Sequence, residues 1–146
     1  MGSTITTDLK KDKEIKNQIR KAWSLMLKFR QVFNSRDVDR RVKHNIYVSG
    51  PLNMLLWGSN TWNLTDTIMK MLNAFHHSVI RWILGIRWEK MKEERITNEE
   101  VRERFNNIPP AKDFIGKRIL IFLRKTIRTS DNKIQKKMLN AWIPIP

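Results

Sequence analysis

Residues 65–85, TDTIMKMLNAFHHSVIRWILG, show a clear helical pattern with a capping residue at each end. Its apolar side chains recur at steps of three and four, at Ile68, Leu72, Phe75, Val79 and Trp82. That spacing is typical of one face of an amphipathic helix. Thr65 is a preferred N-terminal cap, Asp66 suits the positive end of the helix dipole, and Gly85 is a typical C-terminal cap. The pattern therefore predicts a helix that begins and ends with this stretch.

The same period occurs upstream. In residues 14–33 the apolar positions are Ile15, Ile19, Ala22, Met26, Phe29 and Phe33, which predicts a helix with its cations mostly outside the apolar face. Asp37 can cap a further helix, and its inward side chains are expected to be Val38, Val42 and Ile46. Because proline cannot donate a backbone hydrogen bond, Gly50-Pro51 should break or kink this helix before a turn at 58–63.

Downstream, residues 87–95 are expected to form a charged connector. TNEE at 97–100 has the pattern of a capping box and opens a short helix. Pro109-Pro110 then starts a helix over about 111–128, and Ser130-Asp131 caps a last helix that residues 143–146 terminate. Strand-like alternation is absent, so we predict an all-α fold, a compact bundle of about five to seven helices. Residues 14–146 are expected to form a single helical domain after a flexible N-terminus of residues 1–13.

Amino-acid composition limits the classes of partner that the chain can be expected to bind. The 146 residues carry 29 Lys and Arg against 14 Asp and Glu, a net charge of +15, and no Cys. Residues 1–43 contribute +7, residues 44–111 contribute +1 and residues 112–146 contribute +7. Two basic ends favour a polyanionic partner, with nucleic acid ahead of an anionic membrane; basic composition kept for solubility is the alternative. Lacking a secretory signal and a spanning apolar run, the chain is expected in the nucleus or cytoplasm.

No catalytic site is evident. Phosphate-loop and dinucleotide motifs are missing, and the acids in residues 89–103 are interleaved with basic residues, so they are expected to pair along helix surfaces. Two-metal chemistry needs clustered carboxylates, and the adjacent His76 and His77 would diverge by about 100° on a helix. We expect His76 to be half-buried, and His77 and His44 to lie on the surface. The sequence therefore predicts no enzyme, no metal site and no cofactor.

The strongest candidate surface is the helix over 111–128. Five cations lie within about −20° to +100° of Lys117 on a helical wheel: Lys117, Arg118, Arg124, Lys125 and Arg128. The opposite arc is expected to face the core, with Ile115, Ile119, Leu120, Phe122, Leu123 and Ile127. Phe114 and Ile121 fall inside the basic sector and offer apolar contact beside charge. A solvated helix face is the alternative interpretation.

Further cations extend this prediction to the N-terminal half. The candidate nucleic-acid-binding residues there are Arg40, Arg41, Lys43, Arg20 and Lys28. Six tryptophans offer stacking faces for bases, but core packing is the favoured interpretation. Trp82, for example, shares the apolar face of Phe75 and Val79.

Several motifs, in order along the chain, resemble the region that follows the polymerase palm in reverse transcriptases of non-LTR retrotransposons. LLWGSNTWNLT at 55–65 is similar to that family's LLYGSETW-type motif, and MLNAFHHSVIRWILGIRW at 71–88 to its L-x-x-F-H-x-x-x-x-R-x-I-L-G-I-x-W pattern. The remaining matches are IKNQIRKAWSLMLKFRQVF at 15–33, TNEEVRER at 97–104, KRILIFLRKTIR at 117–128 and MLNAW at 138–142. The chain departs from the family pattern at Trp57, Asn60 and Arg124, where the family commonly has Tyr, Glu and Gly.

The resemblance implies a thumb and post-thumb piece without the catalytic palm and its F/Y-A-D-D carboxylates. It implies a non-catalytic remnant that grips RNA or an RNA/DNA duplex through the phosphate backbone, a mode that needs no base code. The implied partners are RNA or hybrid duplex and a reverse-transcriptase palm domain, with no membrane. The alternative is a helical protein-interaction module whose apolar face docks on a palm-like or other partner.

Overall fold

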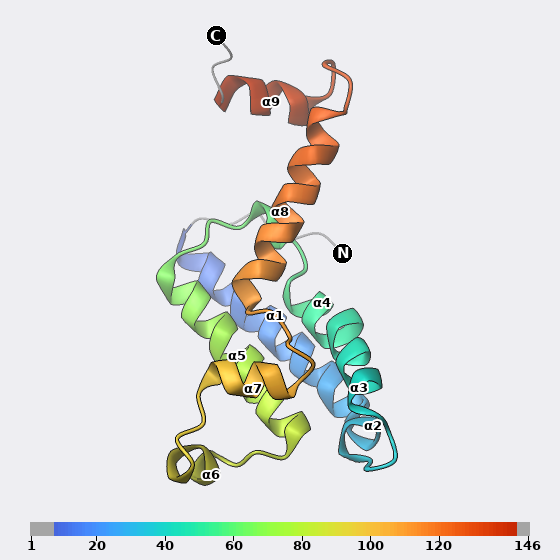
Figure 1. The fold of residues 1–146 in the computed structure, drawn as a ribbon. Helices are drawn as coiled ribbons and strands as arrows, with labels where there is room; N and C mark the ends of the chain where they lie inside the picture. The colour runs from blue at the N-terminus through green and yellow to red at the C-terminus, as the bar shows by residue number, and fades with distance from the viewer. Residues whose placement is uncertain (1–7, 143–146) are drawn as a thin grey trace.

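The computed structural model of the protein describes residues 8–142, and this part of the chain is helical and contains no strand. The predicted all-α class is therefore confirmed (Figure 1). Six of its helices have seven or more residues, in line with the predicted five to seven: α1 (Asp8–Lys28), α3 (Arg40–Tyr47), α5 (Asp66–Leu84), α7 (Asn98–Arg104), α8 (Ala111–Ile127) and α9 (Ile134–Trp142). The shorter elements are α2 (Arg30–Asn34), η1 (Val48–Leu52), α4 (Asn53–Leu55), η2 (Ser59–Thr61) and α6 (Trp88–Glu93).

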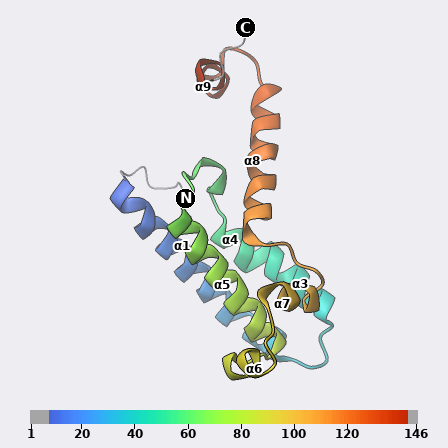
Figure 2. The same ribbon diagram turned by 60° about the vertical axis from the view of Figure 1, so that its left-hand side comes forward.

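Helix α5 packs at the centre of the bundle, alongside α1 (Figures 1 and 2). Both of its predicted caps are confirmed: the Thr65 hydroxyl accepts from the Ile68 amide at 3.3 Å, and Gly85 adopts the left-handed conformation with φ 67°. The apolar faces of α1 and α5 meet residues from η1, α4, α7 and the start of α8 in one core. Its fully buried members include Ala22, Met26, Leu55, Leu72, Val79, Ile80, Val101 and Ile115.

The first helix begins at Asp8, six residues before the predicted start. The first seven residues of the predicted flexible N-terminus lie outside the described part of the chain. At Phe29 the backbone leaves helical geometry, and α2 follows as a separate short helix. This change of direction leaves Phe29 partly exposed, so its predicted inward position is wrong, whereas Phe33 is buried as expected.

The cap of α3 is Asp39, and the prediction of Asp37 is wrong. The Asp39 carboxylate accepts from the Arg41 amide at 2.6 Å, while the Asp37 amide donates to the Ser35 hydroxyl in the preceding turn. Val42 is 46% exposed and does not point inward as predicted. Asp37 and Asp39 are the same residue type, so residue type alone does not distinguish them; the hydrogen bond from the Asp37 amide to the Ser35 hydroxyl holds Asp37 in the preceding turn.

Pro51 does not break the helix. The chain passes it in a π-helical turn, η1, and continues into α4. Proline lacks a backbone hydrogen-bond donor, and the wider spacing of hydrogen bonds in a π turn tolerates that loss. Pro51 and Leu52 are buried in consequence. Gly58 takes a left-handed conformation in the turn that follows, within the predicted turn at 58–63.

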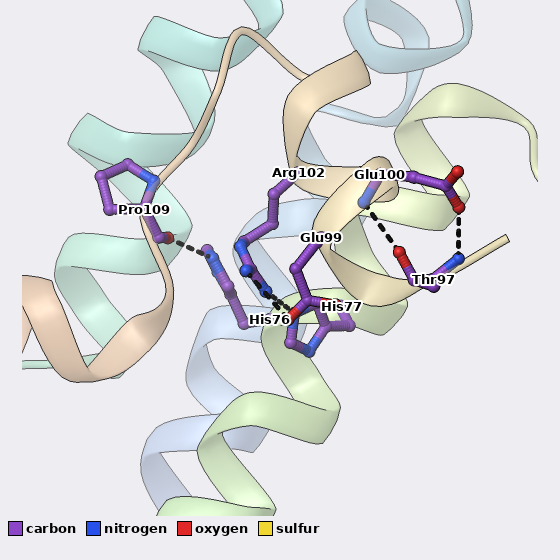
Figure 3. Close-up of polar contacts among 7 residues, drawn as sticks. All are labelled: His76, His77, Thr97, Glu99, Glu100, Arg102 and Pro109. Carbon is purple, nitrogen blue, oxygen red and sulfur yellow. Dashed lines mark hydrogen bonds and ion pairs between the residues drawn. The ribbon is translucent and has the colours of Figure 1, made fainter.

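The charged stretch after α5 is more ordered than predicted, because residues 88–93 form the short helix α6. Met91 is the buried residue of this helix. The predicted capping box of α7 is confirmed. Thr97 Oγ1 accepts from the Glu100 amide at 3.2 Å, and Glu100 Oε2 accepts from the Thr97 amide at 2.6 Å (Figure 3).

Helix α8 contacts α5 and η2 near its start and then extends away from the bundle to α9 (Figures 1 and 2). Its packing on the core includes Ile115 and Ile119. Beyond them Leu120 is 68% exposed and Ile127 is 58% exposed, so their predicted core positions are wrong. The apolar arc exists as predicted, but its outer half is only partly covered among residues 8–142: Phe122 and Leu123 are half-buried and Thr126 is buried, whereas Leu120 and Ile127 are exposed. We call the segment from Leu120 to Trp142 the α8–α9 arm.

Candidate nucleic-acid interface

The predicted basic face of α8 is only partly available. Lys117, Arg124, Lys125 and Arg128 are exposed, and their side chains have no hydrogen bond or ion pair among the described residues. No acidic residue lies between Asp113 and Asp131 to offset their charge. Their mutual repulsion is therefore unrelieved within the helix. We call these four residues the α8 stripe.

Arg118 belongs to the bundle instead. Its guanidinium donates to the Leu56 carbonyl at 3.1 Å and to Asn53 Oδ1 at 2.5 Å, which ties α8 to α4 and the following turn. Partial burial lowers the pKa of Arg118 from its ordinary value. Phe114, also in the predicted basic sector, packs edge-on against the His76 ring. Arg118 and Phe114 are thus both held against the bundle. Ile121, further along the helix, is exposed beside the stripe as predicted.

The predicted cluster at the start of α3 is also divided. Arg40 Nη1 donates to the Arg104 carbonyl at 2.9 Å, and Lys43 Nζ donates to the Ser35 carbonyl at 2.6 Å. Both cations fix loops by binding backbone oxygens. Arg41 is the exposed member that has no side-chain partner in the described part of the chain. The structure therefore does not bring all three together as one free charged surface.

On α1, Arg20 and Lys28 are exposed on the outer face, as required of phosphate-binding residues. Arg20 lines a hollow between α1 and α5 together with Lys16 and Trp23. Sequence reasoning did not single out Trp23, although its spacing of three residues from Arg20 on one helix face could have indicated it. Its indole lies 5.9 Å from the Phe75 ring and 6.2 Å from the Trp82 ring, centroid to centroid.

His76 is fully buried, deeper than the half-buried position predicted for it. Because the Pro109 carbonyl can only accept, His76 Nε2 carries the proton and donates to it at 3.0 Å (Figure 3). Nδ1 then accepts from the Tyr47 hydroxyl at 2.8 Å. Burial lowers the pKa of His76 to about 4, so the ring is neutral at pH 7. This chain of bonds joins α3, α5 and the turn before α8.

His77 is buried, so its predicted surface position is wrong. Its Nε2 accepts from Arg102 Nη1 at 2.9 Å, and Arg102 also pairs with the Glu99 carboxylate at 3.4 Å (Figure 3). Burial lowers the pKa of His77 from its ordinary value, and the neighbouring Arg102 charge lowers it further. The Glu99–Arg102 pair confirms the predicted pairing of acids and bases in this segment. His44, also predicted on the surface, is half-buried against the Phe105 ring.

These networks are structural, because each polar atom in them binds another part of the fold. Residues 8–142 contain no group of three or more His, Cys, Asp or Glu side chains that could hold a metal ion. None of the helices in that range combines the length and apolar character that crossing a bilayer requires. The feature of the described surface best suited to a ligand is its free positive charge.

Comparison with known proteins indicates an origin. No family model and no solved structure matches the chain. An uncharacterized, transposon-derived protein of Caenorhabditis elegans is 24% identical over 133 residues, which cover 90% of this chain and 46% of that protein. The chain therefore spans about half the length of this relative. The similarity supports a transposon origin.

Proposed function

We propose that the chain is a non-catalytic, nucleic-acid-binding remnant of a retrotransposon reverse transcriptase, and that it grips the backbone of RNA or an RNA/DNA duplex. The observation that carries this proposal is the α8 stripe, four exposed and unpaired cations on a helix that extends from the bundle. Similarity to a transposon-derived protein agrees with it. The proposed setting is the nucleus or cytoplasm, with no cofactor.

The geometry of the stripe suits a phosphate backbone. From Lys117 to Arg128 the helix rises roughly 17 Å, at about 1.5 Å per residue. Measured along the axis of a duplex, that length corresponds to about five nucleotide steps, at ~3.4 Å of axis per step of one strand. Contacts of this kind position a protein without reading bases. The proposed binding is therefore nearly independent of sequence.

Equilibrium binding to several RNA/DNA hybrids of unrelated sequence, followed by fluorescence anisotropy, tests the proposal. All hybrids should bind with similar affinity, and binding should weaken steeply between ~50 and 200 mM salt as phosphate contacts release counterions. Strong preference for one sequence, or affinity that barely changes with salt, would contradict backbone gripping.

The second candidate is a protein-interaction module. Exposed apolar side chains on the α8–α9 arm favour it: Leu120, Ile121, Ile127, Ile134 and Met138. A group of large exposed apolar side chains on one arm is typical of an interface that another protein covers. The proposed partner is a palm-like domain. Its binding should persist from ~50 to 200 mM salt, since apolar burial is far less salt-sensitive than phosphate contact, and Leu120→Asp should abolish it.

A further inference from the structure

Two hollows flank the exposed ridge of α5. One lies between α1 and α5, has a volume of about 590 Å³ and includes Trp23 in its lining. The other lies between α5 and the α6–α7 segment, with a volume of about 660 Å³ and Trp88 in its lining. Both include Ala74 and Ser78 in their walls, so the two hollows meet across these small side chains. Each falls in the size range of small-molecule pockets, ~300–1,000 Å³.

The first hollow combines an aromatic surface with positive charge. Trp23 is 41% exposed, and its orientation is fixed by the rings of Phe75 and Trp82 behind it. Lys16 and Arg20 line the hollow about two turns and one turn, respectively, before Trp23 on α1. Neither cation has an ion pair among the described residues. A fixed indole beside two free cations matches a nucleotide, whose base stacks and whose phosphate carries negative charge.

The second hollow continues the positive charge across α5. Lys70 and Arg81 line it, and the Arg81 guanidinium lies 5.3 Å from the centroid of the Trp88 ring. Arg81 also donates to Ser78 Oγ at 3.1 Å, which places its charge beside the ridge. Within the described residues no acidic side chain lines either hollow.

We infer that a single-stranded polynucleotide binds here, with one base stacked on Trp23 and the strand crossing α5 over Ala74 and Ser78 toward Arg81. A duplex would not bind in this way, because its bases are already stacked on one another and cannot reach the indole. Ala74 and Ser78 are exposed and small, so they leave room for a sugar-phosphate backbone. The inference rests on the proposed nucleic-acid function. It adds that the chain also binds single strands, and that it does so on a second surface apart from the α8 stripe.

Binding of a fluorescein-labelled dT 12-mer and of an RNA/DNA hybrid, measured with the full chain, tests the inference. Trp23→Ala should weaken single-strand binding roughly 5- to 100-fold, as expected for one lost base stack, and leave hybrid binding unchanged. Trp57→Ala is the matched control, because Trp57 is exposed but lines neither hollow. Trp23→Phe keeps an aromatic face and should restore most of the affinity, and circular dichroism shows whether each variant is folded.

Arg20→Gln provides a second readout that does not touch the aromatic packing. It should reduce the slope of log affinity against log salt by about 0.7 for the single strand. If Trp23→Ala and Arg20→Gln bind the single strand like the wild type while the hybrid still binds, the inference is overturned and the proposed function stands. If the hybrid fails to bind while the single strand binds through Trp23, the duplex-gripping function is wrong and this inference is supported. Equal losses for the Trp23 and Trp57 variants would also overturn it.

Discussion

Acidification from about pH 7 to about pH 4 should destabilise the fold through His76. The ring is fully buried between Tyr47 and Pro109, and burial lowers its pKa to about 4, against 6.5 for an unperturbed histidine. Between these two values the unfolded chain binds a proton that the folded chain does not. Stability therefore rises with pH across this window and is lost as the pH falls from 6.5 toward 4.

The size of the effect follows from the shift. A difference of about 2.5 pKa units corresponds to about 3 kcal/mol, at 1.36 kcal/mol per unit. The lowered pKa of His77 acts in the same direction. A domain is usually stable by ~5–15 kcal/mol, so protonation of this one group would remove a large share of the stability.

His76→Gln isolates this contribution in urea unfolding followed by circular dichroism. The glutamine amide can accept from the Tyr47 hydroxyl and donate to the Pro109 carbonyl, but it does not titrate. Between about pH 7 and pH 4 the variant should lose about 3 kcal/mol less stability than the wild type. Comparing the two proteins at each pH cancels the other titrating groups. Equal losses in both proteins would refute the assignment of a buried neutral ring.

Three further outcomes are expected. Trp82→Ala should lower the free energy of unfolding, measured in urea, by about 2–3 kcal/mol, because Trp82 is half-buried against Trp23 and Phe33. A fully buried tryptophan typically costs ~3–5 kcal/mol. A cost under about 1 kcal/mol would place Trp82 outside the core. Gly85→Ala should cost about 1 kcal/mol, since Gly85 caps α5 at φ 67° and an added Cβ meets no other atom within 4 Å; an unchanged denaturation midpoint would show that the cap tolerates a side chain. The purified chain should extend no primer with Mg²⁺ or Mn²⁺, because residues 8–142 hold no cluster of carboxylates that could bind the metal ions. Incorporation that survives repurification would contradict the proposed non-catalytic function.

The period of apolar residues predicted the helices well, because each amphipathic face is a local property. The caps at Thr65, Gly85 and Thr97 were predictable for the same reason: their bonds span only three to five residues. Pro51 was not, since the choice between a break and a π turn depends on how the neighbouring segments pack. Its burial beside Leu52 shows that this packing keeps the helix continuous.

The candidate interface was less predictable, because it depends on contacts between distant segments. Arg118 looked like any other cation of its stripe, yet its partners lie 62 and 65 residues away. His77 is covered by Arg102 from α7, a contact that helical phase on α5 alone does not contain. A helical wheel also identifies an apolar arc without showing where its cover ends, which explains the exposure of Leu120. Binding of nucleic acid by the free cations of the α8 stripe remains a prediction.

The salt dependence of hybrid-duplex binding by Arg124→Gln/Lys125→Gln tests whether the α8 stripe contacts phosphates. Glutamine has a helix propensity close to that of arginine and lysine, so the variant should stay helical. Each lost phosphate contact lowers the slope of log affinity against log salt by about one. The matched control is Lys90→Gln/Arg95→Gln, which removes the same charge from the acid-rich segment around α6.

Backbone gripping predicts a slope shallower by about two for the α8 variant, with affinity lowered alike for all sequences, and an unchanged slope for the control. A second comparison uses Arg41→Gln at the other basic end, because Arg41 is exposed and its side chain has no partner among the described residues, whereas Arg40 binds the Arg104 carbonyl. If the α8 and α3 variants both keep the wild-type slope while circular dichroism shows intact helix, the basic ends are solvated surface. That result would contradict backbone gripping and favour the protein-interaction module.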